Sequence, residues 1–199
     1  MRNHHPWVML VLGGRGTGKS QTIGSILSTW PKELGSTLAI DPRAADPPHR
    51  ENIGFWADRW RRSPPDQLEP DTALVACDEA TLILTGRRDE KPLFRELFLR
   101  GRHMGPRGAD GRARGISVLM GTQRPIDMPR TAFTQADRVV IHCLKGRTDL
   151  ERLCELEGMD GTPAGAAALR MIPSLPAGFC VVWDARQGIF LPEVPGWRR

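Results

Sequence analysis

The sequence predicts an α/β fold, in which helices flank both faces of a mainly parallel β-sheet that ends in a C-terminal β-hairpin. Apolar runs of the length of buried strands alternate with segments of helical periodicity along the chain. The first apolar run, residues 7–12, leads through a glycine-rich loop directly into the first helical segment. Strands that alternate with helices pair in parallel, with crossover helices on the faces of the sheet. At 199 residues, we expect a single domain spanning 1–199.

The glycine-rich loop, residues 13–20, reads Gly-Gly-Arg-Gly-Thr-Gly-Lys-Ser and fits G-x-x-x-x-G-K-[ST], the phosphate-binding Walker A pattern. Glycines let backbone N–H groups converge on an anion, and the helix start adds unpaired donors and the positive end of its dipole. We expect Lys19 to reach the β- and γ-phosphates of ATP and the Ser20 hydroxyl to ligate Mg²⁺. The predicted nucleotide-binding residues are Gly13, Gly14, Arg15, Gly16, Thr17, Gly18, Lys19, Ser20 and Gln21.

The next elements are a helix over 19–30, ended by Pro31, and a short buried strand over 37–40. Residues 42–70 are rich in Pro and Arg and predict a surface excursion with one short helix. Aromatic and arginine side chains are interleaved at 55–62, which suits packing onto the domain or a neighbouring subunit, or stacking on bases.

The apolar run 72–77 ends in Asp78 and Glu79, the pattern of a Walker B strand. Asp78 is expected to hold the Mg²⁺ shell, and Glu79 to orient and deprotonate a water molecule at the γ-phosphate. An apolar run that ends in two carboxylates is common at strand ends. The pattern becomes specific because it follows a phosphate loop with one strand between them.

Residues 92–100 predict a helix, and the Arg/Gly-rich loop 100–115 follows, with five arginines and one aspartate. This loop is either a solvated, mobile surface segment, a contact for a nucleic-acid backbone, or the source of an arginine that reaches a neighbouring subunit's γ-phosphate.

Two more buried strands are predicted over 116–121 and 137–143. A helix follows from about residue 148, with Thr148 as its N-cap. The runs 179–184 and 188–191 predict the C-terminal hairpin.

Residues 121–125, Gly-Thr-Gln-Arg-Pro at the end of a strand after Walker B, supply the most discriminating motif. Together with the two Walker motifs it resembles the FtsK–HerA superfamily of DNA-pumping ATPases, over residues 7–159. The resemblance implies a RecA-like sheet in which an additional strand, the one bearing the glutamine, lies between the two Walker strands. It also implies that Gln123 acts as a sensor of the γ-phosphate.

Members of that superfamily work as rings, usually hexamers, in which an arginine from the next subunit completes each ATP site. Arg102 matches the shorter viral members and Arg112 matches the spacing of the FtsK branch, so both are candidates and Arg102 is favoured. The chain resembles most the compact genome-packaging ATPases of tailless, internal-membrane double-stranded DNA viruses.

This resemblance implies an ATP-hydrolysing translocase of double-stranded DNA of any sequence, in a hexameric or pentameric ring that meets capsid vertex proteins. A zonula-occludens-toxin-like phage assembly ATPase, a small-molecule kinase and a nucleotide-switched assembly protein without motor activity are the alternatives. The pair Asp78 and Glu79, followed by Gln123, is less expected in a small-molecule kinase.

The formal charge of +5 and pI near 9.5 suit a nucleic-acid partner but also an ordinary basic enzyme. No apolar run approaches the length of a membrane span and no signal peptide is recognisable, so stable membrane insertion and secretion are not expected. The cysteines lack paired spacing and are predicted to be buried free thiols in a reducing compartment: Cys77, Cys143, Cys154 and Cys180. We expect a soluble protein of the host cytoplasm or the virion packaging vertex.

Overall fold

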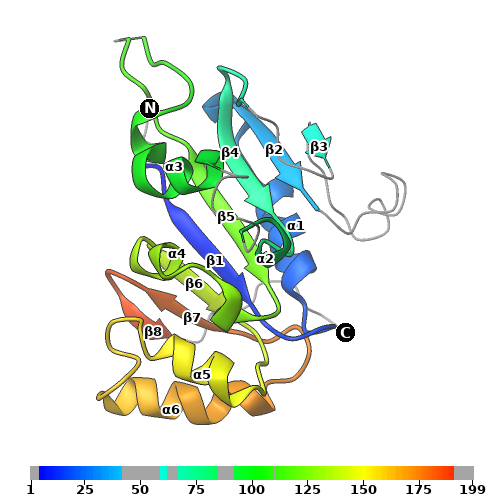
Figure 1. The fold of residues 1–199 in the computed structure, drawn as a ribbon, viewed down its shortest axis with the longest axis vertical. Coiled ribbons are helices and arrows are strands. Elements are labelled where there is room, and N and C mark those ends of the chain that lie inside the picture. Colours follow the sequence, from blue (N-terminus) through cyan, green and yellow to red (C-terminus); the bar gives the residue numbers. More distant parts are fainter. Residues whose placement is uncertain (1–4, 42–58, 62–66, 85–91, 110, 191–199) are drawn as a thin grey trace.

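The computed structural model describes residues 5–41, 59–61, 67–84, 92–109 and 111–190. Within these ranges one eight-stranded sheet runs in the order β3-β2-β4-β5-β1-β6-β7-β8 (Figure 1). Every neighbouring pair from β3 to β6 is parallel, and β7 and β8 continue the sheet as an antiparallel hairpin. The strands are β1 (Val8–Leu12), β2 (Ser36–Ile40), β3 (Arg59–Arg61), β4 (Thr72–Cys77), β5 (Ser117–Thr122), β6 (Arg138–Ile141), β7 (Val181–Asp184) and β8 (Gly188–Phe190). The predicted fold class, including the hairpin, is confirmed.

Helices lie in the connections after β1, β4, β5 and β6. The α-helices are α1 (Lys19–Ser28), α2 (Thr81–Leu84), α3 (Pro92–Arg100), α4 (Arg130–Thr134), α5 (Arg147–Leu153) and α6 (Pro163–Met171). Short 3₁₀ turns extend or join them: η1 (Lys32–Leu34), η3 (Gly101–His103), η4 (Pro125–Asp127) and η5 (Ile172–Ser174). None of the helices in these ranges is long and apolar enough to cross a membrane.

The two faces of the sheet are covered unequally. Successive residues of β1 point to opposite faces, as the pleat of a strand requires. Met9 and Val11 pack with Ile23 and Leu27 of α1. Leu10 and Leu12 face the larger core, which buries side chains of α2 to α6. Because both faces are covered, the central strands are buried along nearly their whole length, and polar groups lie mainly at the strand ends.

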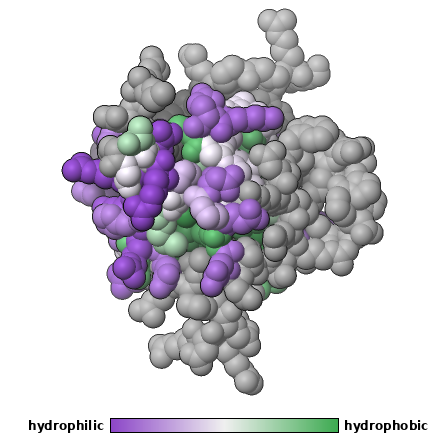
Figure 2. Space-filling view, turned by 90° about the horizontal axis from the view of Figure 1, so that it is seen from above, coloured by the Kyte–Doolittle hydropathy of each residue, from purple (hydrophilic) through white to green (hydrophobic). Residues whose placement is uncertain are grey.

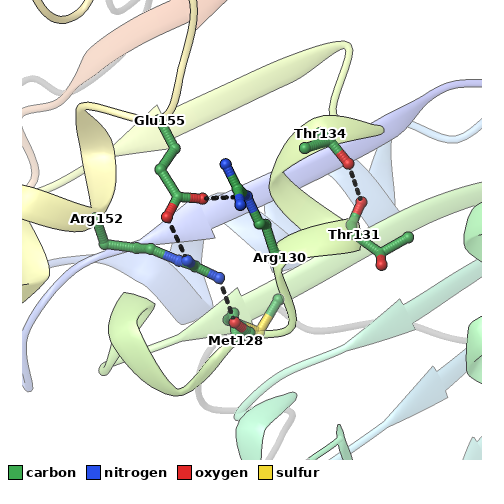
Figure 3. Close-up of polar contacts among 6 residues, drawn as sticks. All are labelled: Met128, Arg130, Thr131, Thr134, Arg152 and Glu155. Atoms are coloured by element: carbon green, nitrogen blue, oxygen red, sulfur yellow. Dashed lines mark hydrogen bonds and ion pairs between the residues drawn. The ribbon is translucent and has the colours of Figure 1, made fainter.

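The segment after β5 is fixed against α5 by polar contacts (Figure 3). Arg152 of α5 donates from Nη1 to Glu155 Oε1 at 2.6 Å and from Nη2 to the Met128 carbonyl at 2.8 Å. Arg130 Nε lies 3.6 Å from the other oxygen of Glu155. The Arg152 guanidinium also lies 5.0 Å from the centre of the Phe133 ring. The chain that leaves β5 therefore has a defined position.

One local expectation needs correction. Gly146, not Thr148, is the N-cap of α5, so the helix begins at Arg147. Within the proposed excursion 42–70, residues 59–61 form an edge strand parallel to β2, and the short helix expected somewhere in this stretch stays a prediction. Residues 42–58 and 62–66 lie outside the described part of the chain.

All four cysteines are free, as predicted, but their burial differs. Cys77 and Cys143 are buried in and after central strands, whereas Cys154 and Cys180 are only partly buried. The prediction of burial is therefore wrong for the last two. Burial raises the pKa of the Cys180 thiol, which lowers its thiolate fraction at neutral pH further.

Candidate active site

The predicted site residues converge at the carboxyl ends of three adjacent strands. The glycine-rich loop follows β1, Asp78 and Glu79 follow β4, and Gln123 follows β5. The additional strand β5 lies between β4 and β1, as the family resemblance implied. The carboxyl ends of parallel strands meet at one edge of a sheet, so motifs that are far apart in sequence become neighbours. This edge lies at the lower right of Figure 1.

The loop after β1 is held by backbone bonds to the strands on either side. The Gly13 amide donates to the Thr122 carbonyl at 3.2 Å, and the Gly14 amide donates to the Cys143 carbonyl at 2.8 Å. Glycine is required at Gly13, where a Cβ would lie 2.7 Å from the Cβ of His142. Gly18 has φ of 112°, a conformation that side-chain-bearing residues rarely adopt, directly before the start of α1.

Lys19 folds back over this loop. Its ammonium donates to the Gly14 carbonyl at 3.1 Å, and only 5% of the residue is exposed. The Thr17 hydroxyl donates to the same carbonyl at 2.8 Å. The loop therefore encloses a buried positive charge beside the N-terminus of α1, which is the arrangement that binds phosphate groups.

Ser20 and Asp78 are in direct contact. The Ser20 hydroxyl donates to Asp78 Oδ2 at 2.6 Å, across 58 positions of sequence. Asp78 is buried, and its other oxygen accepts from the Glu79 amide at 3.0 Å. Hydroxyl and carboxylate oxygens are the donors that Mg²⁺ prefers, so this pair fits the metal of a nucleotide–Mg²⁺ complex.

Glu79 has an uncommon backbone conformation. Its φ of 55° is the one positive value among the non-glycine residues of the described chain. Such a conformation costs on the order of 1 kcal/mol and is found often at functional sites. The hydrogen bond from its amide to Asp78 supports this conformation. Gln123 Nε2 donates to Glu79 Oε1, so the glutamine and the carboxylate are within bonding contact.

Gly121 of β5 allows the two motifs to approach. A Cβ at this position would lie 2.9 Å from Asp78 Oδ1 and 2.6 Å from Ile23 Cδ1 of α1. The Gly121 carbonyl also accepts from the Ala80 amide at 2.7 Å. The glycine before Thr-Gln-Arg-Pro therefore has a packing role that the motif comparison did not assign.

Arg102 and Arg112 lie at the opposite edge of the sheet, and both are exposed. Arg102 belongs to η3, directly after α3, and Arg112 belongs to a small hairpin closed by a bridge between Arg107 and Ala113. This hairpin lies at the top of Figure 1, before the start of β5. Figure 2 views the molecule from this end and shows hydrophilic side chains over much of the coloured surface. Neither arginine belongs to the cluster formed by the other predicted residues.

His142, predicted to lie in the strand over 137–143, packs beside Gly13 of the phosphate loop. It follows β6, and 1% of it is exposed. Its Nδ1 lies 3.0 Å from the Phe179 carbonyl, and its Nε2 lies 3.0 Å from the Thr22 hydroxyl of α1. Because a carbonyl can only accept, we assign the proton to Nδ1, and Nε2 then accepts from Thr22. The sequence signal was a histidine at the carboxyl end of an apolar run.

The environment of His142 favours the neutral imidazole. Burial lowers its pKa below the ordinary value of 6.5, and the nearby charge of Lys19 acts in the same direction. The hydrogen bond to the Phe179 carbonyl opposes this lowering without cancelling it. A neutral ring has one donor and one acceptor, which matches the two partners that it contacts.

No protein-family model matches the chain, and no curated protein matches it either. Solved structures do. The DNA-packaging ATPase B204 of Sulfolobus turreted icosahedral virus is 16% identical, with a TM-score of 0.67 over 94% of this chain and 98% of B204. The genome-packaging NTPase B204 of Sulfolobus turreted icosahedral virus 2, in complex with ATP-gammaS, is 16% identical, with a TM-score of 0.62 over 94% and 97%.

A cellular ATPase is also similar. EccC of Thermomonospora curvata, in complex with a signal sequence peptide, is 13% identical, with a TM-score of 0.57. The match covers 92% of this chain but 36% of that structure. The fold is that of a P-loop ATPase. Its structural neighbours include a viral packaging ATPase and the ATPase EccC, in agreement with the resemblance that the three motifs predicted.

Proposed function

We propose that residues 1–199 form one P-loop ATPase domain that hydrolyses ATP and uses the energy to translocate double-stranded DNA, as a viral genome-packaging motor. The observation that carries the proposal is the contact between Glu79 and Gln123, placed beside the Ser20–Asp78 pair and the phosphate loop. A site that only bound nucleotide would not need a carboxylate held next to a polar sensor.

Each residue has a chemical role in this proposal. The backbone amides of residues 13–20 and the Lys19 ammonium bind the β- and γ-phosphates. Ser20 and Asp78 would hold Mg²⁺, which would offset charge on the phosphates. Glu79 accepts a proton from the attacking water. Gln123 contacts Glu79 and would also contact the γ-phosphate, so that loss of this phosphate would change the contacts at the end of β5.

The exposed arginines supply the remaining part of the proposal. Strand β5 separates Gln123 from the segment that carries Arg102 and Arg112. A strand of this length spans roughly 20 Å, more than an arginine side chain can reach. If such an arginine acts on a nucleotide, that nucleotide belongs to a neighbouring copy, as in the ring of five or six subunits that we propose. We favour Arg102 as the residue that enters the neighbouring site.

Duplex DNA is the proposed cargo. The printed descriptions of the viral neighbours name DNA or genome packaging, and they match nearly the whole of both chains. A net charge of +5 and the exposed arginines at one end suit contact with phosphates, which is independent of sequence. In a virus, the ring would act in the host cytoplasm at the packaging vertex, against capsid vertex proteins.

A polypeptide-translocating ATPase is the second candidate. EccC, whose structure holds a signal sequence peptide, has a similar fold over most of this chain. The fold and the hydrolytic residues would serve both cargoes equally well. The two candidates therefore differ only in which polymer stimulates ATP hydrolysis.

The test is the steady-state rate of ATP hydrolysis with and without long double-stranded DNA, at low and moderate salt, with Glu79→Gln as the blank. Inorganic phosphate must be released when water is the only acceptor, and this result would exclude a small-molecule kinase. We expect stimulation by duplex DNA of any sequence, and weaker stimulation at higher salt. A rate that DNA leaves unchanged would contradict the DNA motor. Negligible turnover at every DNA concentration would favour a nucleotide-switched assembly protein.

A further inference from the structure

The assigned residues all serve one end of the nucleotide. Those for Mg²⁺ and the γ-phosphate, Asp78, Glu79 and Gln123, lie at the ends of β4 and β5, on one side of β1. None of these residues serves the nucleoside. A triphosphate whose γ-end lies on that side and that crosses the loop places its nucleoside on the other side of β1, toward β6 and β7.

The turn 175–179 lies on that other side, between η5 and β7. The Gly178 amide donates to the Thr17 carbonyl of the phosphate loop at 2.9 Å. The approach is close, because a Cβ on Gly18 would lie 3.3 Å from the Gly178 Cα. In Figure 1 the orange segment before β7 passes beside the blue loop after β1. The turn is thus part of the wall around the phosphate loop.

His142 fixes the turn a second time. Its buried ring bridges the Phe179 carbonyl and the Thr22 hydroxyl of α1, each at 3.0 Å. The backbone of residues 178 and 179 is therefore held to both the loop and the helix that follows it. A group carried by this turn is positioned relative to a bound phosphate chain before the nucleotide arrives.

Phe179 is the side chain that this turn presents. It is 57% exposed, more than Leu82, Leu99 or Ile126, the other exposed large hydrophobic residues of the described chain. An exposed aromatic ring on a fixed backbone has a flat apolar face available for a flat partner. Pro176 and Ala177 beside it add no charge to this edge.

We propose that the turn 175–179 forms the nucleoside edge of the site and that Phe179 stacks on the purine base of the bound nucleotide. The inference rests on the proposed nucleotide-binding function and deepens it. Stacking on an aromatic ring tolerates different bases, because every base presents a π-face. His142 is a positioning residue here, since it acts on the base only through the backbone of Phe179.

The test compares nucleotides with a ligand that lacks the nucleoside. Binding of ATP, ADP and inorganic tripolyphosphate to the full chain is measured by calorimetry in the presence of Mg²⁺. The variants are Phe179→Ala and Phe179→Trp, with Leu99→Ala as a matched control that also removes an exposed apolar side chain, on α3.

We expect Phe179→Ala to weaken ATP and ADP about tenfold or more and to leave tripolyphosphate affinity unchanged. Phe179→Trp retains ATP affinity, with quenching of the new indole fluorescence by ATP, and Leu99→Ala changes none of the affinities. Unchanged ATP affinity in Phe179→Ala overturns the stacking. Equal losses for ATP and tripolyphosphate also overturn it, because the turn would then serve the phosphate loop alone. If the unaltered protein binds neither ligand, the proposed nucleotide-binding function itself fails, together with this inference.

Discussion

The two edges of the sheet hold their charged side chains in different ways. At the carboxyl edge, Lys19, Asp78 and Glu79 are each less than 10% exposed and are joined by hydrogen bonds to the loop, to Ser20 and to Gln123. At the amino edge, Arg102 and Arg112 are exposed on short turns. The carboxyl edge is organised within one chain, whereas the amino edge presents its charge outward.

The two edges differ in what their charged side chains are available for. A buried ionised group is costly unless it is paired, so the contacts at the carboxyl edge are needed for the fold as well as for the chemistry. An exposed arginine carries no such constraint and is available to a partner. Under the proposed function, one chain can bind nucleotide, and fast hydrolysis requires the arginine-bearing edge of a second chain.

The largest expected effect comes from the amino edge. Arg102→Ala should lower ATP turnover by about 10³- to 10⁵-fold, the range for arginines that act in trans on a phosphoryl group, and leave ATP affinity intact. Arg112→Ala is the matched comparison from the same edge. Turnover is measured with DNA present, over a range of protein concentrations.

A mixing experiment sharpens that result. Arg102→Ala subunits keep an intact carboxyl edge, whereas Lys19→Ala subunits keep an intact amino edge. Mixtures of the two inactive variants should regain activity, because a Lys19→Ala subunit can donate its arginine to an intact neighbouring site. If Arg102→Ala keeps full ATP turnover and Arg112→Ala loses it, Arg112 is the arginine that acts in trans. Full activity in both variants would contradict a trans arginine at this edge.

A smaller effect is expected from the support of the carboxyl edge. Buried Asp149 of α5 accepts from the Ile126 amide at 3.2 Å and lies 3.7 Å from Arg124, so it fixes the chain directly after Gln123. Asp149→Ala should lower the free energy of unfolding by about 1–2 kcal/mol, because removal of the carboxylate leaves these two donors without their acceptor. Chemical denaturation measures this change.

Glu151 of the same helix provides the control. Its pair with Arg147 is exposed at 2.8 Å, and such pairs contribute about 0.3–0.5 kcal/mol. Equal losses in Asp149→Ala and Glu151→Ala would show that the contact after Gln123 does not support the carboxyl edge.

The smallest expected effect is on the pH dependence of stability. The pKa of His142 is lower in the folded chain than its ordinary value of 6.5, mainly because the ring is buried. The unfolded chain therefore binds the proton more readily, and stability falls as the pH drops from about 6.5 through the folded-state pKa. His142→Gln should flatten the unfolding free energy measured against pH in this acidic window. An unchanged slope would remove His142 from this dependence.

Local sequence patterns predicted the elements that are defined by neighbouring residues in the chain. The run from Val8 through Lys19 could be read because an apolar strand, a glycine loop and a helix start each have their own signal. The prediction that Asp78 and Gln123 converge came from strand order, which the family resemblance supplied. Ser20 and Asp78 were assigned to one metal, and the structure brings them into contact, while their role toward the metal stays a prediction.

Other features depend on tertiary contacts that the sequence hides. The edge strand Arg59–Arg61 has three residues, and only its pairing with β2 defines it. Helix α6 went unrecognised because its alanine-rich sequence has few large apolar residues, although Thr162 and Pro163 gave a cap signal. The contacts of His142 with Thr22 and Phe179 join three segments that no local pattern connects.

The most direct test of the account is the hydrolysis rate of Glu79→Gln, measured together with its affinity for ATP. Glu79 is the proposed base, so turnover should fall by about 10²- to 10⁴-fold while ATP affinity is retained. Glu96→Gln, which changes an exposed glutamate of α3, should behave as the unaltered protein. Undiminished hydrolysis in Glu79→Gln would show that the carboxyl edge does not perform the chemistry proposed for it.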